Sequence, residues 1–209
     1  LAELAGCHGS TVHLREDRRH INDRDVELLK STVAAKFNLE MSLAEPIVKI
    51  AEKIQPDQVT LVPEKRNELT TEGGLDCAGQ AAKLADVTER MHKKGIIVST
   101  FIAPDDKQIH ASADCGVDAV ELHTGTYANA TTPKAVEKSL DAIRDARDVA
   151  VTSGLVVHAG HGLTYRNIGP VAALGGICEF NIGHSIVSRA VLVGMEKATR
   201  EMIDLLAGK

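Results

Sequence analysis

The densest group of chemically capable residues in the chain is the run His13 to His20, in which seven of eight residues are charged or carry an imidazole. The run follows a short apolar segment that is typical of a β-strand. Its three arginines can bind an anion, while His13 and His20 can transfer protons at the same place. A solvated surface loop is the alternative interpretation, because charge runs often form solvent-facing loops.

Two glycine-containing turns near the C-terminus predict phosphate binding. Residues 160–164 (Gly-His-Gly-Leu-Thr) and 181–185 (Asn-Ile-Gly-His-Ser) each follow a predicted strand and open onto a predicted helix. Backbone N–H groups at helix N-termini attract phosphate, and the loops after the last two strands are the usual phosphate site of an α/β barrel. The glycines beside His161 leave its imidazole exposed and let the backbone approach a ligand, which favours a functional role for His161.

Two acidic residues, Glu40 and Glu121, stand inside segments that otherwise read as apolar strands. Burial in apolar surroundings would raise the pKa of either carboxyl and suit it to proton transfer near neutral pH. A structural ion pair is the alternative interpretation for both residues. His123 and His158 lie at comparable strand ends, and for them the alternative is an interior histidine with satisfied hydrogen bonds.

A metal site is a rival explanation for so many histidines. His158 and His161 are three residues apart, and Glu40 or Glu121 could join them as ligands. The sequence contains no H-E-x-x-H motif or comparably compact ligand set, no G-x-S-x-G nucleophile elbow and no Walker loop. We therefore favour acid–base chemistry without a metal.

The elements that must position these residues alternate regularly along the chain. The predicted strands are 10–14, 36–41, 58–62, 96–102, 119–123, 155–159 and 178–182. The predicted helices lie near 24–35, 43–54, 76–94, 105–115, 132–153, 164–173 and 185–206. Ser42 and Glu45 stand at the spacing of a capping box, and Gly95, Gly116 and Gly154 stand where helices end.

Seven strand–helix units in a row predict parallel strands with right-handed crossovers, and no linker divides residues 1–209. An open doubly wound sheet and a closed (β/α)8 TIM barrel both fit, but no G-x-G-x-x-G motif supports the open dinucleotide-binding fold. Residues 1–6 resemble the end of a helix with a glycine stop. We therefore expect one α/β domain, a (β/α)8 barrel whose first strand and most of whose first helix are absent from this chain.

Composition excludes several function classes. Aromatic residues make up 2% of the chain and the net charge is −5, which argues against a nucleic-acid-binding protein. No apolar run approaches the roughly 18 residues that span a membrane. The four cysteines are widely scattered, without a C-x-x-C pair, which is typical of reduced thiols in a cytoplasmic protein.

Seven blocks of sequence closely resemble the pyridoxine 5′-phosphate synthase family, the ring-closing enzymes of vitamin B6 biosynthesis. The resemblance runs in order along essentially the whole chain. Its blocks are TVHLREDRRHI at 11–21, NLEM at 38–41, LVPEKR at 61–66, TTEGGLD at 70–76, ELHTG at 121–125, AGHGLTYRN at 159–167 and NIGH at 181–184.

The resemblance implies a homo-octamer of (β/α)8 barrels that acts on two small phosphorylated substrates without a metal or organic cofactor. It implies condensation of 1-deoxy-D-xylulose 5-phosphate with 3-amino-2-oxopropyl phosphate, releasing phosphate and water. The implied catalytic residues are two proton acceptors, a proton donor and a residue that stabilises the transition state: His13 and Glu40, His161, and Glu121. The implied binding residues are Arg15, His20 and Thr70 for the deoxyxylulose phosphate, and Gly162, Gly183 and His184 for the aminoketone phosphate.

The chain departs from the family pattern at its N-terminus. The family's first strand carries further substrate contacts, an Asn, an Asp-His pair and an Arg, that nothing before Leu1 supplies here. We expect an N-terminally incomplete chain, with activity belonging to the intact protein. Two other function classes remain open: a metal-dependent phosphosugar epimerase or aldolase, and a barrel that binds a phosphate ligand without catalysis.

Overall fold

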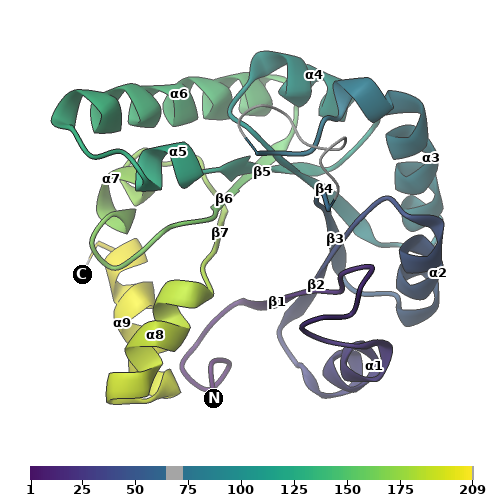
Figure 1. Cartoon of the computed structure of the whole chain (residues 1–209), viewed down its shortest axis with the longest axis horizontal. Coiled ribbons are helices and arrows are strands. Elements are labelled where there is room, and N and C mark those ends of the chain that lie inside the picture. The colour runs from purple at the N-terminus through teal and green to yellow at the C-terminus, as the bar shows by residue number, and fades with distance from the viewer. Residues whose placement is uncertain (65–72, 209) are drawn as a thin grey trace.

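The computed structural model describes residues 1–64 and 73–208, which form a nearly closed barrel of parallel strands surrounded by helices (Figure 1). The seven strands follow one another around the sheet in chain order, and each pairs in parallel with the next. They are β1 (Gly9–His13), β2 (Lys36–Met41), β3 (Gln58–Leu61), β4 (Ile97–Ile102), β5 (Ala119–His123), β6 (Val156–Gly160) and β7 (Glu179–Asn181). This is the predicted (β/α)8 architecture with seven strands.

Helices cover the outside of the sheet (Figure 1). They are α1 (Asp23–Thr32), α2 (Glu45–Ile54), the short 3-10 helix η2 (Ala78–Gln80), α3 (Ala81–His92), α4 (Asp106–Asp114), α5 (Gly125–Ala128), α6 (Pro133–Thr152), α7 (Ile168–Ala172), α8 (His184–Val193) and α9 (Met195–Leu206). Among the described residues, no helix is both long and apolar enough to cross a membrane.

The strand β2 shows how side chains divide between the two faces of the sheet. Phe37, Leu39 and Met41 are buried in the apolar layer between the sheet and the helices. Successive side chains of a strand point to opposite faces, so Asn38 and Glu40 point into the barrel interior. The alternation of apolar and polar residues in β2 therefore explains why an acidic residue stands in an apolar segment: Glu40 points into the barrel interior.

The predicted strands are confirmed, with ends that differ by no more than one residue from those observed. Gly95, Gly116 and Gly154 adopt φ angles of +71°, +75° and +82°, as expected of residues that end helices. Residues 1–6 form turns, in which the N–H of Ala5 donates to the carbonyl of Leu1 at 3.1 Å.

Two expected helical features were wrong, one helix was missed, and the predicted helix near 164–173 is confined to Ile168–Ala172. The predicted helix near 185–206 is two helices, because Gly194 adopts a φ of +85° that breaks the backbone pattern. The short helix α5 was not predicted. Ser42 and Glu45 do not form a capping box: α2 begins after Ala44 without a side-chain cap, and the Ser42 hydroxyl donates instead to Glu16 Oε1 at 3.0 Å.

Gly74 gives a test of packing beside the site. A Cβ at this position would lie 2.3 Å from the backbone nitrogen of Ala103 and 2.6 Å from the carbonyl carbon of Ile102. We expect Gly74→Ala to lower the free energy of unfolding by about 3 kcal/mol in urea denaturation, because backbone atoms must move. Gly169→Ala is the control, since nothing lies within 4 Å of its added Cβ. Equal stability of the two variants would contradict this packing.

Candidate active site

A cavity of about 780 Å³ opens at the carboxyl ends of the strands. This is the end at which α/β barrels carry their active sites, and the volume suits a small-molecule ligand. Seven of the residues singled out from the sequence line it together: His13, Glu40, Glu121, His161, Gly162, Gly183 and His184. Arg15 and His20 are not among its lining residues, and Thr70 falls outside the described residues.

His13 and Glu40 are neighbours across the β1–β2 ladder, where they occupy paired positions. His13 Nδ1 lies 3.9 Å from Glu40 Oε2. Burial raises the pKa of the Glu40 carboxyl, and the charge of His13 partly offsets that rise. The raised pKa makes the Glu40 carboxyl a better proton acceptor than an ordinary surface glutamate.

Glu121 is a fully buried carboxyl on the opposite side of the barrel from the half-buried Glu40. Burial and the nearby negative charge of Glu40 raise its pKa well above the ordinary value. Its Oε2 accepts a hydrogen bond from Asn181 Nδ2 at 2.8 Å. A Cβ at position 160 would lie 2.0 Å from Glu121 Oε1, so the glycine is what makes room for the carboxyl.

A line of hydrogen-bonded side chains crosses the barrel beneath these carboxyls. From Asn181 it continues to Thr11, whose hydroxyl donates to Asn181 Oδ1 at 3.0 Å. Asn38 Nδ2 donates to Thr11 Oγ1 at 3.3 Å, and the Thr60 hydroxyl donates to Asn38 Oδ1 at 3.0 Å. Side chains therefore connect β1 to β7, the first and last strands in the sheet order.

The turn that carries His161 is held in a conformation unusual for a residue with a side chain. His161 has a φ of +78° and Gly162 one of +77°. The buried Thr124 hydroxyl lies 2.6 Å from the carbonyl of His161 and 2.7 Å from that of Gly160. The imidazole of His123 packs beside that of His161, with ring centres 4.8 Å apart. This support fixes an exposed imidazole at the rim of the cavity.

The N-terminus of α8 faces the cavity through Gly183, His184, Ser185 and Ser188. The first turn of α8 contains no acidic residue and no side-chain cap, so its backbone N–H groups can receive an anion. The other predicted turn is closed by Asn167, which accepts from the backbone N–H of Thr164 at 2.6 Å. Of the two predicted phosphate-binding turns, the one at α8 therefore has more backbone N–H groups available to an anion.

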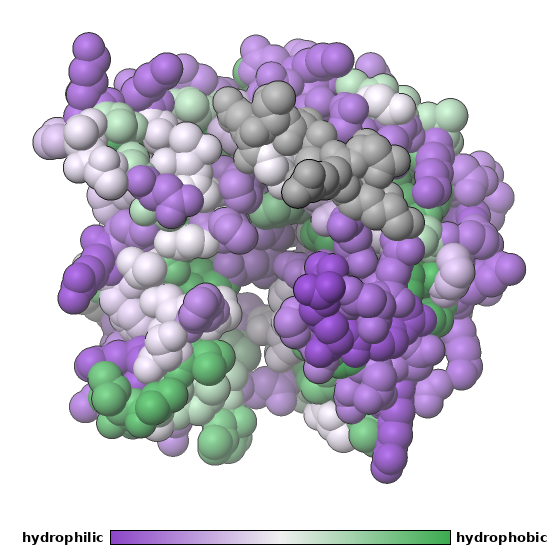
Figure 2. Space-filling model, in the orientation of Figure 1, coloured by the Kyte–Doolittle hydropathy of each residue, from purple (hydrophilic) through white to green (hydrophobic). Residues whose placement is uncertain are grey.

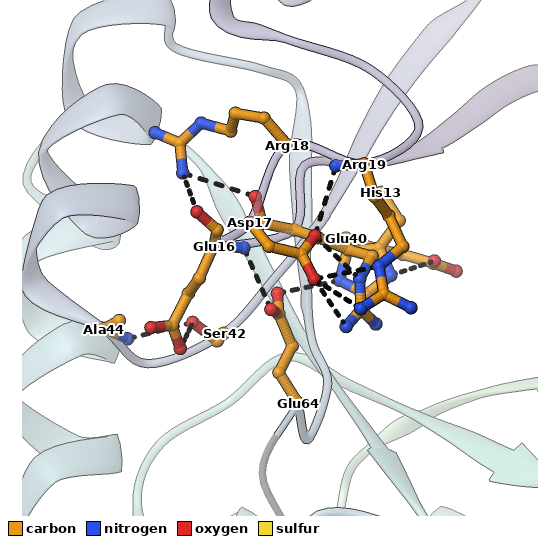
Figure 3. A network of polar contacts seen from close by, with 10 residues as sticks. His13, Glu16, Asp17, Arg18, Arg19, Glu40, Ser42, Ala44 and Glu64 are labelled. Atoms are coloured by element: carbon orange, nitrogen blue, oxygen red, sulfur yellow. Dashed lines mark hydrogen bonds and ion pairs between the residues drawn. The ribbon is translucent and has the colours of Figure 1, made fainter.

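The arginines of the His13 to His20 run pair with acidic residues of their own neighbourhood (Figure 3). Arg15 Nε lies 3.2 Å from Asp17 Oδ1, and Arg19 Nε lies 2.9 Å from Asp17 Oδ2. These guanidinium groups hold the pKa of Asp17 far below its usual range. Arg18 pairs with Asp23 at 2.7 Å. Of the run, His13 alone is among the cavity-lining residues, so the block is divided between the site and a solvated loop.

The structure does not bring together the histidines and glutamates considered above as metal ligands. The part of the chain that the structure describes contains no group of three His, Cys, Asp or Glu side chains placed to hold a metal ion. His158 is buried with its Nδ1 3.9 Å from Glu179 Oε1, and burial lowers its pKa. His158 is therefore an interior histidine, but not a fully satisfied one, because its buried Nδ1 has no hydrogen-bond partner among the described residues.

Sequence reasoning assigned no role to three residues that support the site: Glu64, Thr124 and Asn181. Glu64 and Asn181 carried a usable signal, because each is a polar residue at or just beyond the end of a predicted strand. Thr124 also follows a predicted strand, but its partner could not be predicted because it lies in a turn 36 residues further along the chain. Each supports a cavity-lining side chain by hydrogen bonding to it or to its backbone.

Glu121→Gln tests the buried carboxyl. Because the pKa of Glu121 is raised in the fold, the folded state loses stability as pH rises above the ordinary carboxyl value of 4.5. The variant cannot ionise, so its free energy of unfolding relative to the unsubstituted protein should increase from about pH 5 to about pH 8. Urea denaturation across this range measures the difference. A difference independent of pH would contradict the raised pKa.

Comparisons with known proteins agree with the site. The family model described as "Pyridoxal phosphate biosynthesis protein PdxJ" matches residues 1–208. The chain is 58% identical over 208 residues to a pyridoxine 5′-phosphate synthase of Syntrophotalea carbinolica, covering 100% of this chain and 87% of the relative. It is 56% identical over 209 residues to that of Acaryochloris marina, with 100% and 87% covered.

Solved structures share the fold at low sequence identity. Phosphoribosyl anthranilate isomerase from Thermus thermophilus superposes with a TM-score of 0.63 at 15% identity, over 99% of this chain and 91% of that one. A structure described as "Native KDPGal structure" gives a TM-score of 0.67 at 12% identity, over 99% and 85%. Likeness at this identity shows the barrel fold alone.

Proposed function

Because the chain belongs to the PdxJ family of pyridoxal phosphate biosynthesis proteins, we propose that the cavity at its barrel mouth performs the proton transfers of pyridoxine 5′-phosphate synthesis. The enzyme condenses 1-deoxy-D-xylulose 5-phosphate with 3-amino-2-oxopropyl phosphate and releases phosphate and water. The observation that carries the assignment of the site is one cavity lined by His13, Glu40, Glu121 and His161 together with the N-terminus of α8. Ring closure of this kind requires several acid–base groups and two anion-binding positions.

Each carboxyl has a role that its surroundings support. His13 and Glu40 accept protons as the amine and ketone join and as the ring forms, since both face the cavity and lie 3.9 Å apart. Glu121, whose pKa burial raises well above its ordinary value, donates a hydrogen bond in its protonated form to a developing oxyanion. His161, exposed at the rim, donates a proton to a leaving oxygen.

The binding roles follow the two anionic substrates. Gly162, Gly183 and His184 hold the phosphate of the aminoketone, with the N-terminus of α8 supplying backbone donors. Arg15, His20 and Thr70 hold the deoxyxylulose phosphate. For Arg15 this requires exchange of its contact with the exposed Asp17 for a contact with the phosphate. We expect no metal and no organic cofactor.

The decisive measurement is product formation. When the two substrates are mixed with the full-length protein, we expect the absorbance of pyridoxine phosphate to appear. Glu40→Gln should lower kcat by about 100-fold or more, because the amide cannot accept the proton. Glu196→Gln, an exposed carboxyl of α9, should leave kcat unchanged. Absence of product when both substrates bind would overturn the proposal, and loss of activity on metal removal would favour the metal-dependent alternative.

Assembly into a homo-octamer in the cytoplasm is part of the same proposal. Figure 2 shows apolar side chains gathered over α8, where Val187, Val191 and Leu192 are 55%, 83% and 79% exposed. An exposed apolar patch favours contact with a second copy of the chain. All four cysteines are unbridged, as in proteins of a reducing compartment.

Light scattering after size-exclusion chromatography tests the assembly. We expect the mass of eight chains, and we expect Val191→Glu to yield a smaller species because a charge would be buried in the contact. Val151→Glu is the matched control, since Val151 is an exposed valine on α6, away from α8. A monomer at micromolar concentration would rule out the octamer.

A further inference from the structure

A buried carboxylate stands behind His13. Glu64 lies just after β3, and its side chain is 4% exposed. Its Oε1 lies 3.0 Å from His13 Nε2, and its Oε2 accepts the backbone N–H of Glu16 at 2.9 Å (Figure 3). Glu64 is not among the residues that line the cavity, whereas His13 is. Of the described cavity-lining side chains, His13 is the one to which Glu64 is hydrogen-bonded.

We infer that Glu64 is a positioning residue that fixes the orientation and the tautomer of His13. The inference rests on the proposed role of His13 as a proton acceptor. An ionised carboxylate only accepts hydrogen bonds, so the His13 nitrogen facing Glu64 must carry a proton. In the neutral imidazole that proton sits on Nε2, which leaves Nδ1 unprotonated. Nδ1 is the nitrogen on the Glu40 side of the ring, 3.9 Å from that carboxyl.

The hydrogen bond from the backbone N–H of Glu16 fixes the orientation of the Glu64 carboxylate. One carboxylate oxygen is held by an N–H that cannot rotate away, so the other oxygen is aimed at the imidazole. When Nδ1 takes a proton, the ring becomes an imidazolium, and Glu64 stabilises the charge from behind. Many acid–base sites contain the same carboxylate–imidazole pair, in which the carboxylate orients the ring and is not itself protonated.

A purely structural role is the competing explanation, because Glu64 also ties the segment after β1 to the segment after β3. Ser42 offers a matched control for that role. Its buried hydroxyl braces the same segment through Glu16 Oε1 at 3.0 Å, without touching His13. Loss of bracing alone should therefore affect Ser42→Ala and Glu64→Gln alike, whereas loss of ring orientation should affect only Glu64→Gln.

Kinetics of single and double variants separate these explanations. We expect Glu64→Gln to lower kcat at least about 10-fold with little change in KM, and Ser42→Ala to retain kcat. In a His13→Asn background, Glu64→Gln should add almost no further loss, because the two residues act as a unit. The inference would be overturned if the losses of kcat in the two single variants multiplied in the double variant, or if Glu64→Gln alone retained its kcat. Unchanged activity in His13→Asn alone would instead remove the proposed role of His13.

The tautomer itself can be measured without any variant of Glu64. In ¹⁵N-histidine-labelled protein, nitrogen NMR distinguishes a protonated Nε2 from a protonated Nδ1, and His13→Asn identifies the His13 signals. We expect neutral His13 to carry its proton on Nε2 in the unsubstituted protein, and the preference to weaken in folded Glu64→Gln. A proton on Nδ1 in the unsubstituted protein would overturn the inference even if Glu64→Gln fails to fold.

Discussion

The alternation of side chains along parallel strands is the constraint on which the rest of this molecule depends. A strand in a barrel has one face against the helices and one face toward the interior, and its residues must satisfy both. In β2 this places three apolar residues in the core and sends Asn38 and Glu40 inward. Carboxyls in such a position have raised pKa values because water is scarce there. The chemistry of the site is thus a direct result of strand geometry.

Polar residues in the interior also contribute to the integrity of the barrel. No backbone ladder among the described residues joins β1 to β7, yet the side chains of Thr11 and Asn181 connect them. The same asparagine holds Glu121. Support of the fold and support of the site therefore use shared hydrogen bonds, and the two requirements cannot be separated at Asn181.

Much of this could be predicted from the sequence, because the signals were local. Strand positions followed from short apolar runs, and the grouping of His13, Glu40, Glu121 and His161 followed from the rule that carboxyl ends of barrel strands meet. The break at Gly194 was missed because a glycine inside an apolar, helical pattern is also compatible with one continuous helix. Pairings such as Arg15 with Asp17 depend on side-chain conformations that spacing does not determine. The position of Glu64 just beyond a strand marked it as a candidate, but its partner and that of Thr124 lie in distant segments that no local pattern identifies.

Gly160 and Glu121 have a consequence for how this enzyme can change. The carboxyl occupies the volume that any side chain at position 160 would need, so the acid and the missing Cβ form a single steric unit. A side chain at position 160 therefore requires the Glu121 carboxyl to move or to be replaced by a shorter residue, and a shorter residue removes the buried acid. A change of substrate preference that keeps the buried acid must therefore alter other walls of the cavity and leave Gly160 in place.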